Sequence, residues 1–202
     1  LAQTWQPAPI SLSGNTDCYQ PAERKFKITR QLLSILAKYK NPVSIITKNS
    51  LVLRDVDILK DLASENLVHV YVSITSLDEE VRQLLEPRTA TAKKRLMVIE
   101  TLAKANIPVG VMVAPIIPAI NQHEISNIVK AAADAGAYAA NMIVVRLNGA
   151  IASIFKDWLK KNYPDRHEKV IHQIESLHGG IVNDSRLGKR MRGEGEFAEL
   201  IQ

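Results

Sequence analysis

Apolar residues along this chain switch repeatedly between two spacings. Short runs rich in Val and Ile predict five strands, over residues 9–13, 42–47, 68–74, 108–114 and 141–146. Apolar residues at helical spacing predict helices between and after them, over residues 29–38, from Asp55 through Leu62, through Leu96 and Leu102, from Asn121 to Ala135, and over 151–161 and 165–177. Strands that alternate with helices favour right-handed β-α-β units in a parallel sheet, either open or closed as a barrel.

Helix-end signals support these boundaries. Asp55 is a candidate cap for its helix, and Asn121 with Glu124 resembles a capping box. Gly136 ends the helix that follows, and a long polar insert separates the third strand from its helix. We expect one domain over 1–202 that ends in a helical and loop extension from about residue 150, with a core-poor loop over 186–196.

Composition places the chain among folded domains outside the membrane. Its 202 residues are 46% hydrophobic and 23% charged, and no apolar stretch approaches the roughly 18 to 20 residues of a membrane span. The sequence therefore predicts a cytoplasmic protein with no membrane contact. The net charge of +5 permits an anionic partner, but the basic residues are spread over many predicted helices.

Cysteine and histidine usage limits the metal chemistry. Cys18 is the single cysteine of the sequence, which excludes an intrachain disulfide and an iron–sulfur site built from this chain alone. His167 and His172 stand five residues apart on one predicted helix, and the other histidines show no ligand spacing. We predict no metal ligand within the sequence.

Polar residues follow the predicted strands where parallel α/β proteins carry their sites. These are Asn15-Thr16-Asp17, Thr47-Lys48-Asn49, Ser73 to Ser76, and Arg146, while Pro115 and Pro118 end the fourth strand. Each is also an ordinary loop residue. Lys48 is either solvated or directed into the mouth of the barrel, and Arg88 is either a carboxylate clamp or the surface partner of Glu86.

Several of these segments are familiar in combination: Asn15-Thr-Asp-Cys-Tyr-Gln-Pro-Ala-Glu23, Ile46-Thr-Lys-Asn49, Leu53-Arg-Asp55, Leu85-Glu-Pro-Arg88, Met112-Val-Ala-Pro-Ile-Ile-Pro118 and Arg190-Met-Arg-Gly-Glu-Gly195. Over nearly its whole length the chain resembles radical S-adenosylmethionine (radical SAM) proteins of the group similar to spore photoproduct lyase, often labelled DNA repair photolyase-like. The resemblance implies an α/β fold, a partial parallel (β/α)6-type barrel, with about five strand-helix units present here.

The resemblance also implies cofactors. In the family, the first unit carries a Cys-x3-Cys-x2-Cys loop that holds a [4Fe–4S] cluster, and the cluster binds S-adenosylmethionine. We expect that unit to be absent here, so the chain would be the C-terminal portion of the enzyme and would hold no cluster alone. The full-length protein would use S-adenosylmethionine, the cluster and an electron donor.

Individual roles follow from position within the family. Asn15, Thr16 and Asp17 are expected at the methionine amino group, with Thr47 and Lys48 lining the mouth beside them. The expected contacts further along the chain are Ser73 and Thr75 with the ribose or methionine, Arg88 with a carboxylate, Val113, Ala114 and Pro115 with the adenine, and Arg146 with cofactor or substrate. Lys48 and Arg146 are the candidate catalytic residues.

The predicted function is generation of a 5′-deoxyadenosyl radical by a lyase-like enzyme, with nucleic acid as a candidate substrate and the fragment alone inactive. Two alternatives stay open. Lys48 is also suited to form a Schiff base, as in lysine-dependent barrel enzymes. The basic balance also permits a non-catalytic module that binds nucleic acid.

Overall fold

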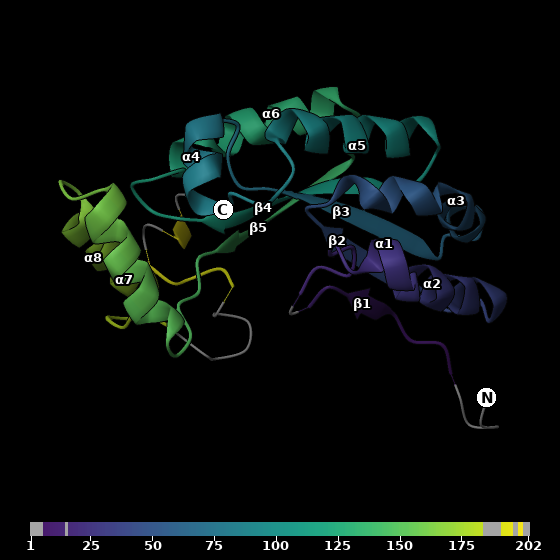
Figure 1. Ribbon diagram of the computed structural model, residues 1–202, viewed down its shortest axis with the longest axis horizontal. Helices are drawn as coiled ribbons and strands as arrows, with labels where there is room; N and C mark the ends of the chain where they lie inside the picture. The colour runs from purple at the N-terminus through teal and green to yellow at the C-terminus, as the bar shows by residue number, and fades with distance from the viewer. Residues whose placement is uncertain (1–5, 15, 184–190, 196–197, 200–202) are drawn as a thin grey trace. The chain divides into compact units, whose positions relative to one another are not determined.

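The computed structural model describes residues 6–14, 16–183, 191–195 and 198–199. It contains one five-stranded sheet in the order β1-β2-β3-β4-β5, with strands that run parallel and alternate with helices (Figure 1). The strands are β1 (Ile10–Leu12), β2 (Val43–Thr47), β3 (Val68–Ile74), β4 (Val109–Ile116) and β5 (Ala139–Val144). All five predicted strands are therefore present, and the predicted α/β class with a partial parallel barrel is confirmed.

The helices that connect or follow these strands are α1 (Glu23–Phe26), α2 (Ile28–Lys38), α3 (Val56–Ser64), α4 (Glu79–Leu85), α5 (Ala92–Lys104), α6 (Ile125–Asp134), α7 (Ile151–Asn162) and α8 (His167–Leu177). Two short 3-10 helices, η1 (Ser50–Asp55) and η2 (Gln122–Glu124), precede α3 and α6. The insert predicted only as polar contains α4. No helix in the described part of the chain has the length and hydropathy needed to cross a bilayer.

The chain divides into two compact lobes. The first lobe comprises Leu1–Ile74, Arg88–Met112 and Lys130–Ala140, and the second comprises Thr75–Pro87, Val113–Val129 and Asn141–Gln202. The chain passes between them within β4 and β5. The extension predicted from about residue 150 lies in the second lobe, and its predicted loop over 186–196 lies mostly outside the described residues. A single domain over 1–202 stays a prediction.

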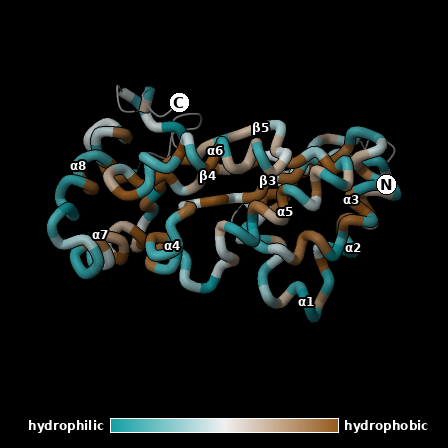
Figure 2. Tube along the Cα trace, turned by 90° about the horizontal axis from the view of Figure 1, so that it is seen from above, coloured by the Kyte–Doolittle hydropathy of each residue, from teal (hydrophilic) through white to brown (hydrophobic). Residues whose placement is uncertain are grey.

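Alternation along the strands builds the core of the first lobe. In β2 and β3, Val43 pairs with Val68 and Ile45 with Val70, and all four side chains are buried. Because paired residues of neighbouring strands share a face, these side chains form one apolar surface. Buried leucines and isoleucines of the helices complete the core, namely Leu33, Leu59, Leu62, Ile99 and Leu102. The β3 and β4 segments are correspondingly hydrophobic in Figure 2.

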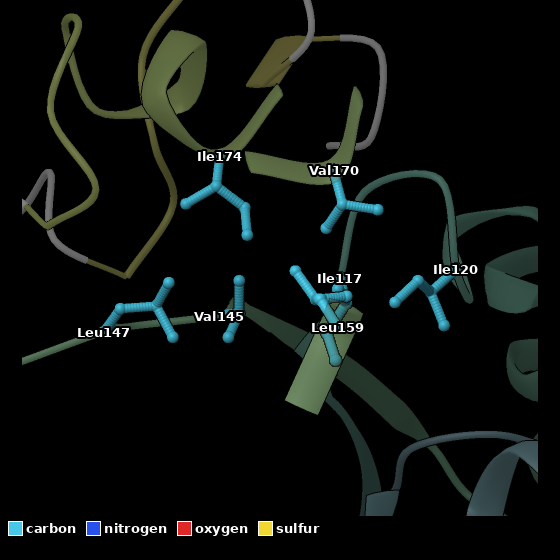
Figure 3. Close-up of a cluster of buried hydrophobic side chains, with 7 residues drawn as sticks. All are labelled: Ile117, Ile120, Val145, Leu147, Leu159, Val170 and Ile174. Carbon is cyan, nitrogen blue, oxygen red and sulfur yellow. The ribbon is translucent and has the colours of Figure 1, made fainter. Parts of the chain in front are cut away.

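The second lobe has a core of its own. Seven buried aliphatic side chains converge from the segment after β4, the segment after β5 and helices α7 and α8 (Figure 3): Ile117, Ile120, Val145, Leu147, Leu159, Val170 and Ile174. The apolar faces of α7 and α8 supply three of them, which explains why both helices carry the periodic pattern visible in the sequence.

Candidate functional site

Asp17 fastens the loop after β1 to the end of β2. The Thr47 hydroxyl lies 2.9 and 3.0 Å from its two carboxylate oxygens and donates to them. The backbone N–H groups of Lys48 and Tyr19 donate to the same carboxylate at 2.8 and 2.9 Å. Hydrogen bonds to an ionised group are stronger than neutral ones, so Asp17 fixes the position of Lys48 at the strand end.

A buried ionic network lies next to this loop. The Asp55 carboxylate, with none of its surface exposed, accepts hydrogen bonds from Arg54 at 2.8 Å, Arg30 at 2.9 Å and the Tyr19 hydroxyl at 3.1 Å. Arg54 also bonds the buried Glu23 at 2.8 Å. The network therefore joins the 15–23 segment to the 53–55 segment. The predicted helix-capping role of Asp55 is wrong, because its side chain makes no cap hydrogen bond.

The network fixes the charge state of its members. Burial alone would raise the pKa of Asp55, but hydrogen bonds from Arg54 and Arg30 outweigh it and hold the pKa below its ordinary value. The pKa of Glu23 is lowered in the same way, by Arg54 and the N–H groups of Thr29 and Arg30 against the effect of burial. Both carboxylates are thus ionised at neutral pH.

An open cleft of about 460 Å³ lies at the strand ends of the first lobe. A volume of roughly 300–1,000 Å³ is typical of small-molecule sites. Four cationic side chains and one carboxylate, that of Asp17, are among its lining residues; the cations are Arg24, Lys48, Arg88 and Lys94. Asp17 already accepts hydrogen bonds from three donors, so the excess positive charge favours a ligand with a carboxylate or phosphate.

Arg95 connects the Arg88 side of the cleft to β3. Its buried guanidinium donates to the carbonyl oxygen of Ser73 at 2.8 Å, to that of Ala90 at 2.9 Å and to the Thr89 hydroxyl at 2.6 Å. Ser73 itself is buried at the end of β3. Arg95 could not be singled out from the sequence, because its position in a helical pattern suggests a solvated side chain.

The remaining predicted residues at the ends of β3 and β4 lie in the second lobe. The hydroxyl of Thr75, buried, lies 2.9 Å from both the Ala114 carbonyl oxygen and Glu86. Asn121 donates to the carbonyl oxygens of Thr75 and Pro115 at 2.7 and 2.9 Å and accepts from the Ile117 N–H. Asn121, which was predicted to cap a helix, therefore stabilises the end of β4 instead, and the capping-box prediction is wrong.

Glu124, the second residue of that predicted capping box, also makes hydrogen bonds other than those of a cap. It accepts from the Ser76 hydroxyl at 2.6 Å and the Leu77 N–H at 2.7 Å, and so orders the start of the insert. Arg146 follows β5 in the same lobe. Its Nε is buried and has no hydrogen-bond partner among the described residues.

The structure therefore brings part of the predicted set together. Asp17, Lys48 and Arg88 line the cleft, and Thr47 donates a hydrogen bond to Asp17. Thr16 is exposed on the same loop, while Asn15 lies outside the described residues. Ser73 is in the first lobe, and the members of the second lobe are Thr75, Val113, Ala114, Pro115 and Arg146. Val113 is buried, and Ala114 and Pro115 are half-buried.

Cys18 does not resemble a metal ligand. Burial raises the pKa of its thiol to about 11, against a smaller lowering by the Ser13 hydroxyl. The thiol is thus protonated at neutral pH, whereas iron and zinc bind the thiolate. Within the described ranges no three His, Cys, Asp or Glu residues are grouped to hold a metal ion. The chain's own residues do not fit an iron–sulfur cluster.

Comparison with known proteins gives a family match and related folds. The model of the Radical SAM superfamily matches residues 8–132. The uncharacterized protein Rv2578c of Mycobacterium tuberculosis (strain H37Rv) is 30% identical over 164 residues, which are 80% of this chain and 48% of that protein. The uncharacterized protein MJ0683 of Methanocaldococcus jannaschii is 29% identical over 159 residues, 79% of this chain and 58% of that protein. The chain spans about half the length of these relatives.

Two solved structures of spore photoproduct lyase share the fold. A single-residue mutant superposes with a TM-score of 0.59 at 17% identity, over 81% of this chain and 47% of that one. The lyase complexed with dinucleoside spore photoproduct superposes with a TM-score of 0.57, also at 17% identity and with the same coverage. At this identity the likeness concerns the fold alone.

Proposed function

Because this chain belongs to the Radical SAM superfamily, we propose that it is the strand-and-helix body of a radical S-adenosylmethionine enzyme whose cleft in the first lobe binds the cofactor's methionine end. One observation carries the proposal: four cationic side chains surround a cleft at the carboxyl ends of parallel strands. Sites of parallel α/β proteins lie at these ends. A carboxylate is the group that such a cluster binds.

The chain's own residues would divide the work of binding. Lys48 and Arg88 would hold the methionine carboxylate, and Asp17 would keep Lys48 in place through the strand-end hydrogen bonds. Thr16 and Asn15 would serve the amino group, and Ser73 the ribose or methionine. The roles expected of Thr75, Val113, Ala114, Pro115 and Arg146, which belong to the second lobe, stay predictions.

The radical chemistry needs a partner outside this sequence. S-adenosylmethionine bound to a reduced [4Fe–4S] cluster supplies a 5′-deoxyadenosyl radical. The cluster takes three thiolates, and Cys18 supplies one half-buried thiol. We therefore propose that a Cys-x3-Cys-x2-Cys loop elsewhere in a longer protein holds the cluster, that an electron donor reduces it, and that this chain alone is inactive.

We propose nucleic acid as the substrate class and a lyase-like reaction. A spore photoproduct lyase of the same fold binds a dinucleoside spore photoproduct. The excess of cations around the cleft would also attract the phosphates of a nucleic acid. A cytoplasmic location accords with these partners.

Calorimetric titration of this chain with S-adenosylmethionine tests the cleft. We expect Lys48→Ala and Arg88→Ala each to weaken binding by about tenfold, which corresponds to about 1.4 kcal/mol. Lys104→Ala is the matched control, since Lys104 is an exposed lysine on α5 that pairs with Glu100. Equal affinity in all four proteins would refute the assignment.

Decarboxylated S-adenosylmethionine separates carboxylate binding from general electrostatics. If Lys48 and Arg88 hold the carboxylate, the substitutions should change the affinity for this analogue by less than about twofold. The lysine-dependent alternative has its own signature. A covalent adduct at Lys48 after borohydride reduction with a carbonyl compound would favour a Schiff-base enzyme instead.

A further inference from the structure

Three exposed cations line the first-lobe cleft without a carboxylate partner. They are Arg24 on α1, Arg88 before α5 and Lys94 on α5. In the described part of the chain, none of the three forms an ion pair. Other exposed basic residues of this lobe do have such a partner, as Lys104 has Glu100. The cleft therefore gathers positive charge that the described residues do not neutralise.

The placement of these cations is unfavourable without a ligand. Like charges that line one cleft repel one another, and solvent and salt weaken the repulsion without removing it. Lys94 also lies in the first turn of α5, a turn that contains no acidic residue. The helix dipole opposes a positive charge at that position. An anion bound in the cleft would relieve both effects.

Buried neighbours fix the backbone that carries two of these cations. Glu23, next to Arg24, is 4% exposed and accepts a hydrogen bond from Arg54 at 2.8 Å. Arg95, next to Lys94, is 2% exposed and donates to a carbonyl oxygen at the end of β3 at 2.8 Å. A side chain on an ordered backbone loses less freedom when it binds a ligand. Arg24 and Lys94 are thus attached to segments that are already ordered.

The methionine end of S-adenosylmethionine leaves part of this charge unbalanced. The cofactor carries one carboxylate together with two cationic groups, the ammonium and the sulfonium. In the proposed function, that carboxylate meets Lys48 and Arg88. The Asp17 carboxylate of the cleft is engaged by its own hydrogen bonds. Arg24 and Lys94 therefore lack a counter-charge even when the cofactor is bound, which favours a second anionic group in the cleft.

A phosphate matches this second position best. The planar guanidinium of Arg24 is suited to bind phosphate oxygens through two parallel hydrogen bonds, and Lys94 adds a compact charge. A phosphate presents oxygens in several directions and can meet cations from separate helices, whereas a carboxylate presents two oxygens in one plane. The cleft volume of about 460 Å³ is within the range of sites for whole ligands, so it has room beyond the methionine end.

We propose that Arg24 and Lys94 form a phosphate subsite in this cleft. It is distinct from the Lys48 and Arg88 pair, and it binds a phosphate group of the molecule that shares the cleft with the cofactor. A phosphodiester of nucleic acid and the phosphate of a free nucleotide both supply this chemistry. The inference rests on the proposed function in taking the cleft as the cofactor's, and it adds a chemical requirement for the substrate.

Binding of a fluorescent oligothymidylate of about ten nucleotides to the 202-residue chain tests the subsite. Arg24→Ala and Lys94→Ala should each weaken binding by about fivefold. Each should also reduce the slope of log K against log salt concentration by roughly 0.7, the value for one phosphate contact of a single strand. Lys60→Ala is the matched control, because Lys60 is exposed on α3 and does not line the cleft. Arg24→Lys, which keeps the charge, should preserve the slope.

Matched ligands show whether the phosphate is the group that binds. The same oligothymidylate with neutral methylphosphonate linkages should bind at least about tenfold more weakly, and its affinity should not respond to Arg24→Ala. Thymidine monophosphate identifies the source: tighter binding of the oligothymidylate indicates nucleic acid, and tighter binding of the monophosphate indicates a free nucleotide. Equal binding of the charged and neutral linkages would overturn the proposal, as would an equal loss in Lys60→Ala.

An acidic protein is the competing partner for the same charges. A polyglutamate peptide that binds as tightly as the oligothymidylate, with the same response to Arg24→Ala and Lys94→Ala, would replace the phosphate by carboxylates. Weaker binding of this peptide would support the phosphate subsite, since two carboxylate oxygens in one plane do not fit cations on separate helices.

The phosphate subsite and the proposed function fail separately. Titration with S-adenosylmethionine should show no weakening in Arg24→Ala or Lys94→Ala, because the cofactor's carboxylate is assigned to other residues. If these variants lose oligothymidylate binding in a chain that does not bind the cofactor, the subsite is supported and the cofactor assignment is refuted. If the chain binds the cofactor and neither variant changes oligothymidylate binding, the subsite alone is overturned.

Discussion

At the scale of single residues, two carboxylates that the sequence singles out make their hydrogen bonds with the protein itself. Asp17 was expected at a cofactor, yet its carboxylate is already engaged by Thr47 and two N–H groups. Asp55 was expected to cap a helix, and instead it is the buried centre of an ionic network. Sequence position identifies a polar residue at a strand end but does not specify all of its partners, because several of them come from segments 25 to 36 residues away.

The Asp55 network should dominate the acid stability of the chain. Asp55→Asn removes a buried charge that two arginines neutralise, and we expect a loss of about 2–3 kcal/mol in the free energy of unfolding at pH 7. The folded-state pKa of Asp55 is lowered, so its stabilisation is complete above the unfolded pKa of about 4 and disappears as the pH falls below it. Urea unfolding of the unchanged chain and of Asp55→Asn, measured at pH 7 and at pH 3, should therefore show a smaller difference in unfolding free energy between the two proteins at pH 3.

A matched substitution on α3 checks that the effect belongs to the network. Asp61 is exposed on α3, the helix whose Asp57 bonds Arg30 of the network, and Asp61→Asn should change the free energy of unfolding by less than about 0.5 kcal/mol. A similar loss in both variants would mean that general surface charge, and not the Asp55 network, governs stability.

At the scale of elements, alternation and length decided what the sequence could predict. The strand predicted over 68–74 has those bounds in the structure, because buried and half-buried side chains alternate over most of its length. Helix α4 was missed, since seven residues with two leading glutamates are too short for a helical period to stand out. Its start was still visible in principle: Asp78 accepts from the N–H groups of Glu80 and Val81, as a cap does.

The contact between β4 and β3 depends on the absence of a side chain at Gly110. A Cβ there would lie 2.6 Å from Cε1 of Tyr71 and 2.9 Å from the carbonyl oxygen of Ala139. The ring can shift, but the backbone oxygen of β5 cannot do so cheaply. We expect Gly110→Ala to lower the free energy of unfolding by about 1–3 kcal/mol, measured by urea denaturation.

Two comparisons give this prediction a clear outcome. Gly14→Ala is the control, because a Cβ at Gly14 would have no atom within 4 Å, and its effect should stay within about 0.5 kcal/mol. Adding Tyr71→Ala to Gly110→Ala removes the ring but leaves the contact with Ala139. If Gly110→Ala proves neutral, the strands are spaced more widely than described.

At the scale of the whole molecule, the residues alone predicted a parallel α/β architecture, and the resemblance supplied the family, which the superfamily match confirms. The division into two lobes could not be anticipated, since the chain crosses within strands β4 and β5 and no linker marks the change. Neither the parallel architecture nor the division into lobes accounts for the radical chemistry. That chemistry depends on three cysteine thiolates, and this sequence contains one cysteine.

Anaerobic reconstitution with iron and sulfide should leave this 202-residue chain without a stoichiometric cluster. Three thiolates are needed, and Cys18 is one thiol whose pKa is raised to about 11 by burial, so it is a poor ligand near neutral pH. Iron content, visible absorption and 5′-deoxyadenosine formation should match those of Cys18→Ser, the control for adventitious binding. A longer protein with an upstream Cys-x3-Cys-x2-Cys loop should acquire all three signals. A full cluster with turnover in this chain would instead place the chemistry within it, with ligands that no thiol count predicts.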